Sequence, residues 1–317
     1  MPAETNTFRT TQAVGNREIL LDVIYDISPE EVPFQSNGGR GKEAEGTKLE
    51  WQNDQLDAPD GANARHEGNV AVVEVINPTV RLSNFCQISD KTFAVSRTQE
   101  KVRKAGRKSE AKRALQRKIA ALRRDQEVIL TGNQAAQGVT EPRRLGSILS
   151  WITSNVNMGA TGVNPVGNGT NVRTDGTQRA FTEALLKDVL AKVWNSGGSA
   201  DIVMVGSFNK QAASAFTGIA AIRKAVEGAK RATIVAGADV YVSDFGNITF
   251  VPNRFSRARD ALVLDTDMYS VQYLSDYEVS DLGKIGDTAA RKLIVAEYTL
   301  KVNTEKAHGL IADLTTS

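Results

Sequence analysis

The stretch from Arg97 to Arg124 constrains this chain more than any other segment. It holds twelve basic residues and only two acidic ones, Glu100 and Glu110. Residues 98–131 contain no Pro and one Gly, and their apolar residues recur at spacings of three or four. This pattern predicts one long helix over 98–131, about 50 Å in length, with a narrow apolar stripe and a broad basic face.

The basic face of this helix needs a partner. Like charges one helical turn apart repel each other, and twelve against two is more imbalance than an exposed helix normally tolerates. Because the whole chain has a net charge of only +2, the other segments are acidic on balance, including 1–34 and 40–91. The candidate partners are therefore acidic neighbouring subunits, which we favour, and the phosphates of DNA. A solvated helix face is the alternative. The candidate contact residues are Arg103, Arg107, Arg113, Arg117, Arg123 and Arg124.

Residues 40–76 are typical of an extended hairpin loop rather than of a domain core. Strands are predicted over 47–56 and 70–76, with a polar turn region over 57–69 between them. A two-stranded hairpin is marginal alone in water, so we expect this one to lie on a second subunit. The candidate hinge residues are Gly38, Gly39, Gly41 and Gly46, and the candidate tip residues are Asp57, Asp60, Arg65, His66 and Glu67.

The length of 317 residues favours two compact regions over one. The first is an α/β region over 151–260. Its predicted elements are helices over 177–194, 207–216 and 219–230, a buried strand over 201–206 and a hairpin over 239–251.

The second region is discontinuous, because the α/β region is inserted into it. Two short strands are predicted over 79–95, and others over 261–264, 269–274 and 293–303. The last one alternates between apolar and polar residues, which fits a sheet packed on one face only. The long helix is the natural element to cover that face.

The sequence gives little support for catalysis or metal binding. Cys86 is the only cysteine, and His66 and His308 are the only histidines, so no zinc site is expected. Both histidines are predicted to be solvated turn residues. The segment 131–175 is rich in Gly, Asn and Thr and is predicted to be a long exposed loop. Its glycine-rich centre, 159–169, lacks the Gly-Lys-Ser/Thr of a phosphate-binding loop. We expect no catalytic residue, cofactor or metal, and hence no enzyme.

The chain contains no apolar run of membrane-spanning length, and its first residues lack the features of a secretion signal. These features predict a soluble protein in the cytoplasm.

Short motifs along nearly the whole chain resemble one branch of a known family. They are residues 13–18 (AVGNRE), 24–29 (IYDISP), 33–34 (PF), 50–52 (EWQ), 104–107 (KAGR), 123–125 (RRD), 130–133 (LTGN), 251–254 (VPNR), 295–300 (VAEYTL) and Asn303. In this order they resemble the major capsid proteins of tailed bacteriophages, which have the Hong Kong ninety-seven-type fold.

The resemblance implies an α+β fold with a set division of the chain. The implied parts are an N-terminal arm over 1–39, an extended loop over 40–76, a peripheral domain over 77–150 with the spine helix 98–131, an axial domain over 151–260, and the C-terminal strands of the peripheral domain over 261–317. In that family the axial domains gather around five-fold and six-fold axes, and the loop lies across a neighbour. Unlike the founding member, this chain has no long helical scaffold segment before the arm. No Lys and Asn can be matched to a covalent cross-link.

The resemblance implies a non-enzymatic subunit that assembles as pentamers and hexamers into an icosahedral head shell around double-stranded DNA. The implied partners are a portal, scaffolding or decoration proteins, and the packaged DNA, with no membrane. The implied location is the virion, after assembly in the bacterial host cytoplasm. The alternatives are an encapsulin-like cargo compartment of the same fold and a non-specific DNA-binding protein that uses the basic helix.

Overall fold

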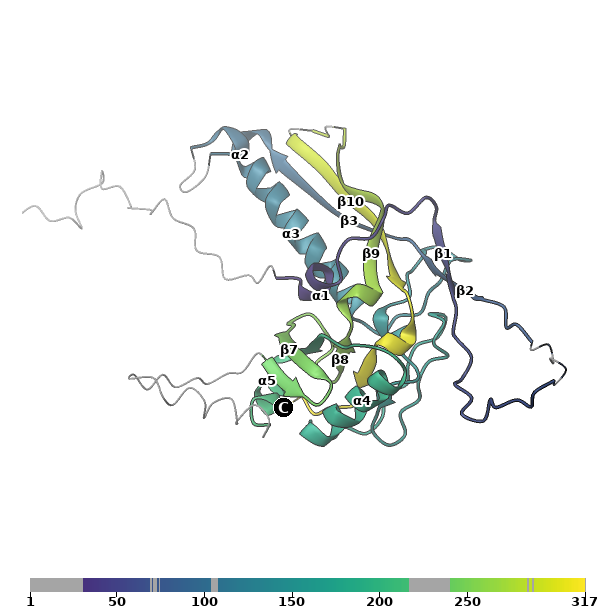
Figure 1. Ribbon diagram of the computed structural model, residues 1–317. Coiled ribbons are helices and arrows are strands. Elements are labelled where there is room, and N and C mark those ends of the chain that lie inside the picture. The colour runs from purple at the N-terminus through teal and green to yellow at the C-terminus, as the bar shows by residue number, and fades with distance from the viewer. Residues whose placement is uncertain are drawn as a thin grey trace, which may run out of the picture.

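The computed structural model combines an elongated part, built on one long helix and three strands, with a rounder part built on a six-stranded sheet (Figure 1). It describes residues 31–316 except 69, 71, 72, 74, 104–107, 217–239, 284 and 287. Most of the predicted N-terminal arm, the helix predicted over 219–230 and Arg107 lie outside the described residues.

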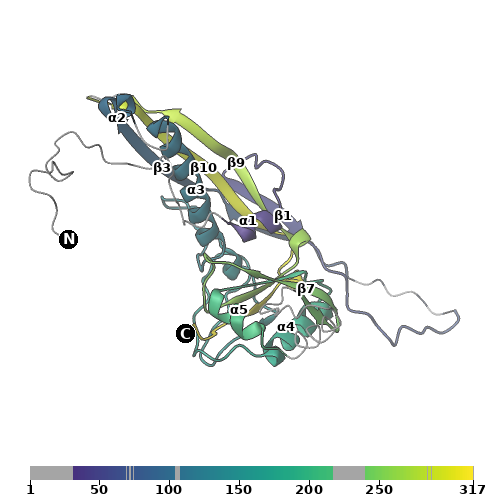
Figure 2. The same cartoon turned by 90° about the vertical axis from the view of Figure 1, so that its left-hand side faces the viewer.

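The elongated part is an antiparallel sheet of order β3-β10-β9 with a helix on one face (Figure 2). Its elements are β3 (Gln87–Ser96), β9 (Tyr269–Asp281), β10 (Thr288–Val302) and α3 (Glu110–Leu130). From Ile294 onward, every second residue of β10 is buried in the cluster that also contains Leu122 and Leu130 of α3: Ile294, Ala296, Tyr298, Leu300 and Val302. The predicted one-sided sheet, covered by the basic helix, is therefore confirmed.

The prediction of one continuous helix over 98–131 is wrong. A short helix, α2 (Arg97–Lys101), ends where Val102 adopts an extended conformation, and α3 begins after Ser109. The Ser109 hydroxyl accepts a hydrogen bond from the backbone N–H of Lys112 at 3.2 Å. The Glu100 carboxylate accepts bonds from the backbone N–H groups of Glu110 and Ala111 at 3.0 and 3.3 Å. These caps stabilise a new helix start, whereas a continuous helix would stack more like charges on neighbouring turns.

The rounder part is a mixed six-stranded sheet of order β4-β11-β8-β5-β7-β6, with two helices on one face. Its elements are β4 (Val156–Asn157), α4 (Glu183–Asn195), β5 (Ile202–Val205), α5 (Ser207–Ala213), β6 (Val240–Ser243), β7 (Gly246–Pro252), β8 (Ala261–Leu264) and β11 (Gly309–Ile311). The buried strand predicted over 201–206 and the hairpin over 239–251 are confirmed. The strand predicted over 261–264 belongs to this sheet and not to the three-stranded one.

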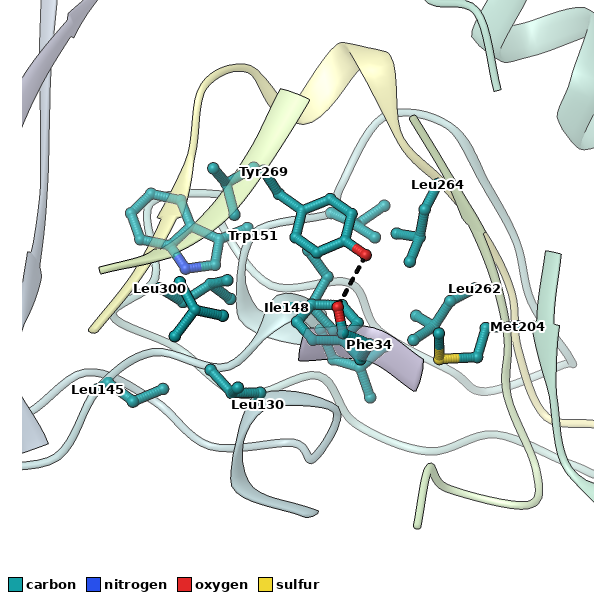
Figure 3. Close-up of a cluster of buried hydrophobic side chains, with 14 of the residues drawn as sticks. Phe34, Leu130, Leu145, Ile148, Trp151, Met204, Leu262, Leu264, Tyr269 and Leu300 are labelled. Atoms are coloured by element: carbon teal, nitrogen blue, oxygen red, sulfur yellow. Dashed lines mark hydrogen bonds between the residues drawn. The ribbon is translucent and has the colours of Figure 1, made fainter. Parts of the chain in front are cut away.

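Alternating residues of the six-stranded sheet face two different hydrophobic clusters. In β5, Val203 and Val205 pack with α4 and α5. Ile202 and Met204 face the opposite cluster, which contains residues of α1 (Pro33–Asn37), α3, β9 and β10. Figure 3 shows part of this second cluster, with Phe34 and Tyr269 at its centre. The length of the chain predicted two compact regions, and these two clusters therefore share one sheet, each packing on one of its faces.

The segment 131–175, predicted to be a long exposed loop, contributes to the core instead. Leu145, Ile148, Leu149, Trp151 and Ile152 are all buried there, around the 3-10 turn η2 (Ile148–Ser150). Glycine permits this packing. Gly169 has φ +80°, and a Cβ at this position would lie 2.6 Å from the Trp151 ring.

Two helix boundaries also differ from the prediction. The helix expected from Thr177 begins at Glu183, because the preceding residues pair with the C-terminal segment through a bridge between Arg179 and Leu314. The helix expected over 207–216 is shorter, ending at Ala213.

The first strand of the hairpin lies within the predicted 47–56, but the second is formed by other residues than the predicted 70–76. β1 (Lys48–Asn53) pairs with β2 (Val80–Phe85), so that Lys48 lies opposite Phe85 and Asn53 opposite Val80. The described residues of the segment 70–76, predicted to be the second strand, lie outside any strand. The paired arms are each six residues long, shorter than the predicted strands 47–56 and 70–76. Among the described residues, no helix has the length and apolarity needed to cross a bilayer.

We expect Ile294→Ala to lower the free energy of unfolding by about 2 to 5 kcal/mol, because it opens a cavity between β10 and α3. The matched control is Ile88→Ala on the neighbouring strand β3, where the side chain is 52% exposed. Chemical denaturation of the unassembled chain measures both. Equal losses for the two variants would contradict the assignment of the buried face.

Candidate assembly surfaces

The described residues of the connection between β1 and β2, which spans 54–79, leave the body of the molecule as an open loop (Figure 1). Five aliphatic side chains on it are more than 80% exposed: Leu56, Val70, Val73, Val75 and Ile76. Near its base, Lys306 Nζ donates to Gln55 Oε1 at 2.5 Å, beside a cavity of about 730 Å³. Isolated exposed apolar residues are normal, but a run of them along one projecting segment is typical of an interaction surface.

All five predicted tip residues lie on this loop and are exposed. Asp57 lies near the base, where its Oδ1 accepts a hydrogen bond from the Asn77 side chain at 3.2 Å. Asp60 Oδ1 accepts a bond from the backbone N–H of Ala62 at 2.8 Å. Arg65, His66 and Glu67 follow further out along the loop. With Asp54, the loop has four carboxylates and one arginine between residues 54 and 67, so its surface is acidic.

Three of the four predicted hinge glycines are docked on β9 rather than placed at the loop. The Gly41 N–H donates to Val271 O at 3.1 Å, and the Val271 N–H donates to Gly39 O at 3.3 Å. At Gly38, a Cβ would lie 2.0 Å from the Tyr269 ring, so glycine lets the chain pass close to that ring. Gly46 is different, because it lies beside β1, where a Cβ would meet only Lys48 O at 3.9 Å.

The predicted basic contact residues fall into two groups along α2 and α3. Near the end of α3, Arg123 lies over the Tyr277 ring at 5.4 Å, and Arg124 lies over the Phe255 ring at 5.1 Å. These two guanidinium groups therefore make contacts within the chain. Arg113 lies 3.6 Å from the Glu110 carboxylate, and Arg117 is exposed on the same helix. Arg103 is exposed beyond α2, and Arg107 lies outside the described residues.

Exposed basic side chains lie near α2 and the start of α3, at the end of the elongated part that is away from the six-stranded sheet (Figure 2). We define the basic end by its exposed side chains, which are Lys101, Arg103, Lys108 and Lys112.

The last residues of the predicted arm dock on the core through Glu127, which sequence analysis missed. The buried Glu127 carboxylate accepts hydrogen bonds from the backbone N–H groups of Phe34 and Gln35, at 2.6 and 3.2 Å. It also accepts bonds from the side chains of Gln35 and Asn253, at 3.0 and 2.8 Å. Burial raises the pKa of Glu127, and the four hydrogen bonds oppose this shift. The Gln126-Glu127 pair between the apolar residues Leu122 and Leu130 was the available signal in the sequence.

A second buried carboxylate, Asp313, holds the glycine-rich segment against the C-terminal strand. It accepts hydrogen bonds from the backbone N–H groups of Gly159 and Gly176 at 3.0 and 2.8 Å. It also pairs with Arg173 and Arg259 at 2.9 and 3.0 Å. Although burial opposes it, these partners lower the pKa of Asp313. The backbone here has φ +61°, an uncommon value for a residue other than Gly.

The prediction that both histidines are solvated is wrong for His308. His66 is exposed on the loop, as expected, but His308 is fully buried beside Tyr269, with ring centroids 5.8 Å apart. Burial lowers the pKa of His308 to about 4, because an apolar site disfavours the charged ring. Among the described residues, no three His, Cys, Asp or Glu side chains are grouped as metal ligands would be.

The comparisons with known proteins agree with this architecture. Residues 4–315 match the family model described as SU10 major capsid protein. The chain belongs to this family. The curated major capsid protein of Escherichia phage Phieco32 is 28% identical over 239 residues, which cover 65% of this chain and 67% of that protein. The protein is thus a phage major capsid protein, a structural subunit of the shell, and the prediction of its function is confirmed.

Solved structures show that the fold is shared widely. The capsid of cyanophage A-1(L) is similar over 98% of this chain and 99% of its own, with a TM-score of 0.64 and 11% identity. The capsid of a native GTA particle covers 95% of this chain and 96% of its own, with a TM-score of 0.59 and 11% identity. The SrpI encapsulin of Synechococcus elongatus PCC 7942 covers 95% and 93%, with a TM-score of 0.55 and 12% identity. These likenesses place the chain among mixed α/β capsid folds.

We expect replacement of His308 to remove a pH dependence of stability. The pKa of His308 is about 4 in the folded chain, against an ordinary value of 6.5, so the unfolded chain binds more protons between these values. The folded chain should therefore lose roughly 3 kcal/mol as the pH falls from 6.5 to 4, and be unaffected by this group above pH 6.5.

Denaturation of wild type and His308→Gln at pH 4.5 and 7.5 measures this difference. The variant should show a smaller loss at low pH than wild type, although it is less stable at pH 7.5. His66→Gln, on the exposed loop, is the control and should behave as wild type. An equal acid loss in wild type and His308→Gln would refute the assignment.

Proposed function

We propose that this capsid subunit assembles as pentamers and hexamers into the icosahedral head shell of a tailed phage, around double-stranded DNA. The observation that carries the proposal is the projecting loop 54–79, with five exposed aliphatic side chains. A neighbouring subunit would supply the burial that these side chains lack. A portal and scaffolding or decoration proteins are the further partners that this role implies. The shell would be assembled in the host cytoplasm and remain in the virion.

Within this proposal the six-stranded part is the axial domain and the three-stranded part with α3 is the peripheral domain, whereas the resemblance implies that all of 261–317 is peripheral. The pairing of β8 and β11 supports assigning those strands to the axial side. The acidic loop and the basic end are complementary in charge, which supports a contact between the loop of one copy and the basic end of another.

Replacing residues 55–78 with a short Asn-Gly turn should give a folded chain that does not assemble. The ends of β1 and β2 are paired, Asn53 with Val80, so a turn can join them without disturbing the body. Analytical ultracentrifugation and electron microscopy should show monomers or small oligomers, with a thermal transition close to that of wild type. Closed particles formed by this variant would overturn the proposed role of the loop.

Charge reversal at the basic end tests which acidic group it meets. The variant Arg103→Glu/Lys108→Glu/Lys112→Glu should assemble poorly, because it sets negative charge against the acidic loop. Adding Asp54→Lys, Asp57→Lys and Asp60→Lys should restore particle yield if the loop of a neighbour is the partner. Normal but empty shells without this compensation would instead assign the basic end to DNA. Lys187→Glu on α4, an exposed position outside both surfaces, is the control.

The alternative of a cargo compartment rests only on the fold that the chain shares with an encapsulin at 12% identity. Purified particles that hold protein instead of DNA would favour it. A non-specific DNA-binding protein would form small oligomers with a steep dependence of duplex affinity on salt, in place of large particles.

A further inference from the structure

Glu127 is the point where three segments distant in sequence meet. It lies on α3 and is fully buried. Its carboxylate receives three hydrogen bonds from Phe34 and Gln35 of α1, the helix in which the N-terminal arm reaches the body. A fourth comes from the side chain of Asn253, which follows strand β7 of the six-stranded sheet. An ionised carboxylate has about four lone-pair sites, so these four donors satisfy it.

Asn253 links Glu127 to the turn 253–256, which follows β7. While its amide nitrogen donates to Glu127, its Oδ1 accepts hydrogen bonds from the backbone N–H groups of Phe255 and Ser256, at 2.8 and 3.3 Å. The Phe255 ring in turn lies under Arg124 of α3. The orientation of one Asn side chain therefore depends on Glu127 at one end and fixes the turn 253–256 at the other.

The docking of α1 depends on the same carboxylate. The Phe34 ring stacks on Tyr269 with centroids 4.6 Å apart, and the Tyr269 hydroxyl donates to Phe34 O at 3.1 Å (Figure 3). If α1 leaves this site, Glu127 loses three of its four donors. A buried charge without partners is costly, so the side chain would have to turn toward water and would then release Asn253.

We propose that Glu127 couples the docking of the N-terminal arm to the turn 253–256, so that the two segments open and close together. The coupling works in both directions, because each segment supplies donors that the other needs in order to keep the carboxylate buried. It is a property of the single chain and does not depend on the assembly of a shell. In a shell, it would let an arm that is pulled out of place alter the turn that follows β7.

Hydrogen exchange on the full-length, unassembled chain tests the coupling with two variants that each remove one donor. Asn253→Ala should accelerate exchange of the Phe34 and Gln35 amides, and Gln35→Ala should accelerate exchange of the Phe255 and Ser256 amides. Each acceleration should be about tenfold or more, because hydrogen bonds to charged groups contribute that much to an opening equilibrium. In the double variant the effects should be less than multiplicative, since both act through one carboxylate.

Glu127→Gln should accelerate exchange in both segments. The NH₂ of the new amide would face the N–H groups that now bond to the carboxylate, and it cannot accept hydrogen bonds from them. Glu278→Gln, an exposed position on β9, is the matched control and should change neither. Acceleration confined to the mutated segment in both single variants would overturn the proposal. Equal acceleration throughout the chain, including the amides of β10, would also overturn it, because it would indicate general destabilisation in place of a specific connection.

Discussion

The structure depends on the central strands of one sheet, β5 and β8, which are buried on both faces. Strands β5 and β8 send alternate side chains to opposite sides, so that Val203 and Val263 join the α4 cluster while Met204 and Leu262 join the α3 cluster. Because successive side chains of a strand point to opposite faces, a polar residue at any of these positions would disrupt one of the two cores. This explains why the four residues of β5 and of β8 are all apolar. Because the same strands contribute to both clusters, the sheet also fixes the elongated part relative to the rounder part, without a separate interface.

The elements that could be predicted from sequence are those whose periodicity is long and regular. The alternation in β10 identified a one-sided sheet, and the apolar stripe in α3 identified the helix that covers it. The break between α2 and α3 was not predicted, because the stripe continues across it while the caps at Glu100 and Ser109 come from side chains that also occur within helices. The second strand of the hairpin was placed wrongly for a related reason. Residues 70–76 have the composition of a strand, but it is Val80–Phe85 that pairs in register with β1.

Surface charge could be read from the sequence more easily than burial. The acidic loop and the basic segment were identified from residue types alone, and the structure leaves most of those side chains exposed. Glu127, Asp313 and His308 were missed, because a single charged or polar residue does not reveal how far its surroundings remove it from water. Each is held by segments more than forty residues away in the chain, for example Asp313 by Gly159 and Arg173. Such distant pairings have no local periodicity.

The exposed side chains of the loop also limit the free energy that one contact between subunits can contribute. Fully burying a large aliphatic side chain contributes about 1.5 to 3 kcal/mol, so the five on this loop could contribute roughly 7 to 15 kcal/mol to one contact. The loss of translational and rotational freedom on association costs about 4 to 15 kcal/mol, which is of the same size. One loop contact between two free subunits would therefore be marginal. A subunit that joins a partly closed ring makes more than one such contact for a single loss of freedom, so closed assemblies are favoured over dimers. In the proposed pentamers and hexamers, a contact of this strength would permit subunits to dissociate from wrong positions early and would hold them once the ring has closed.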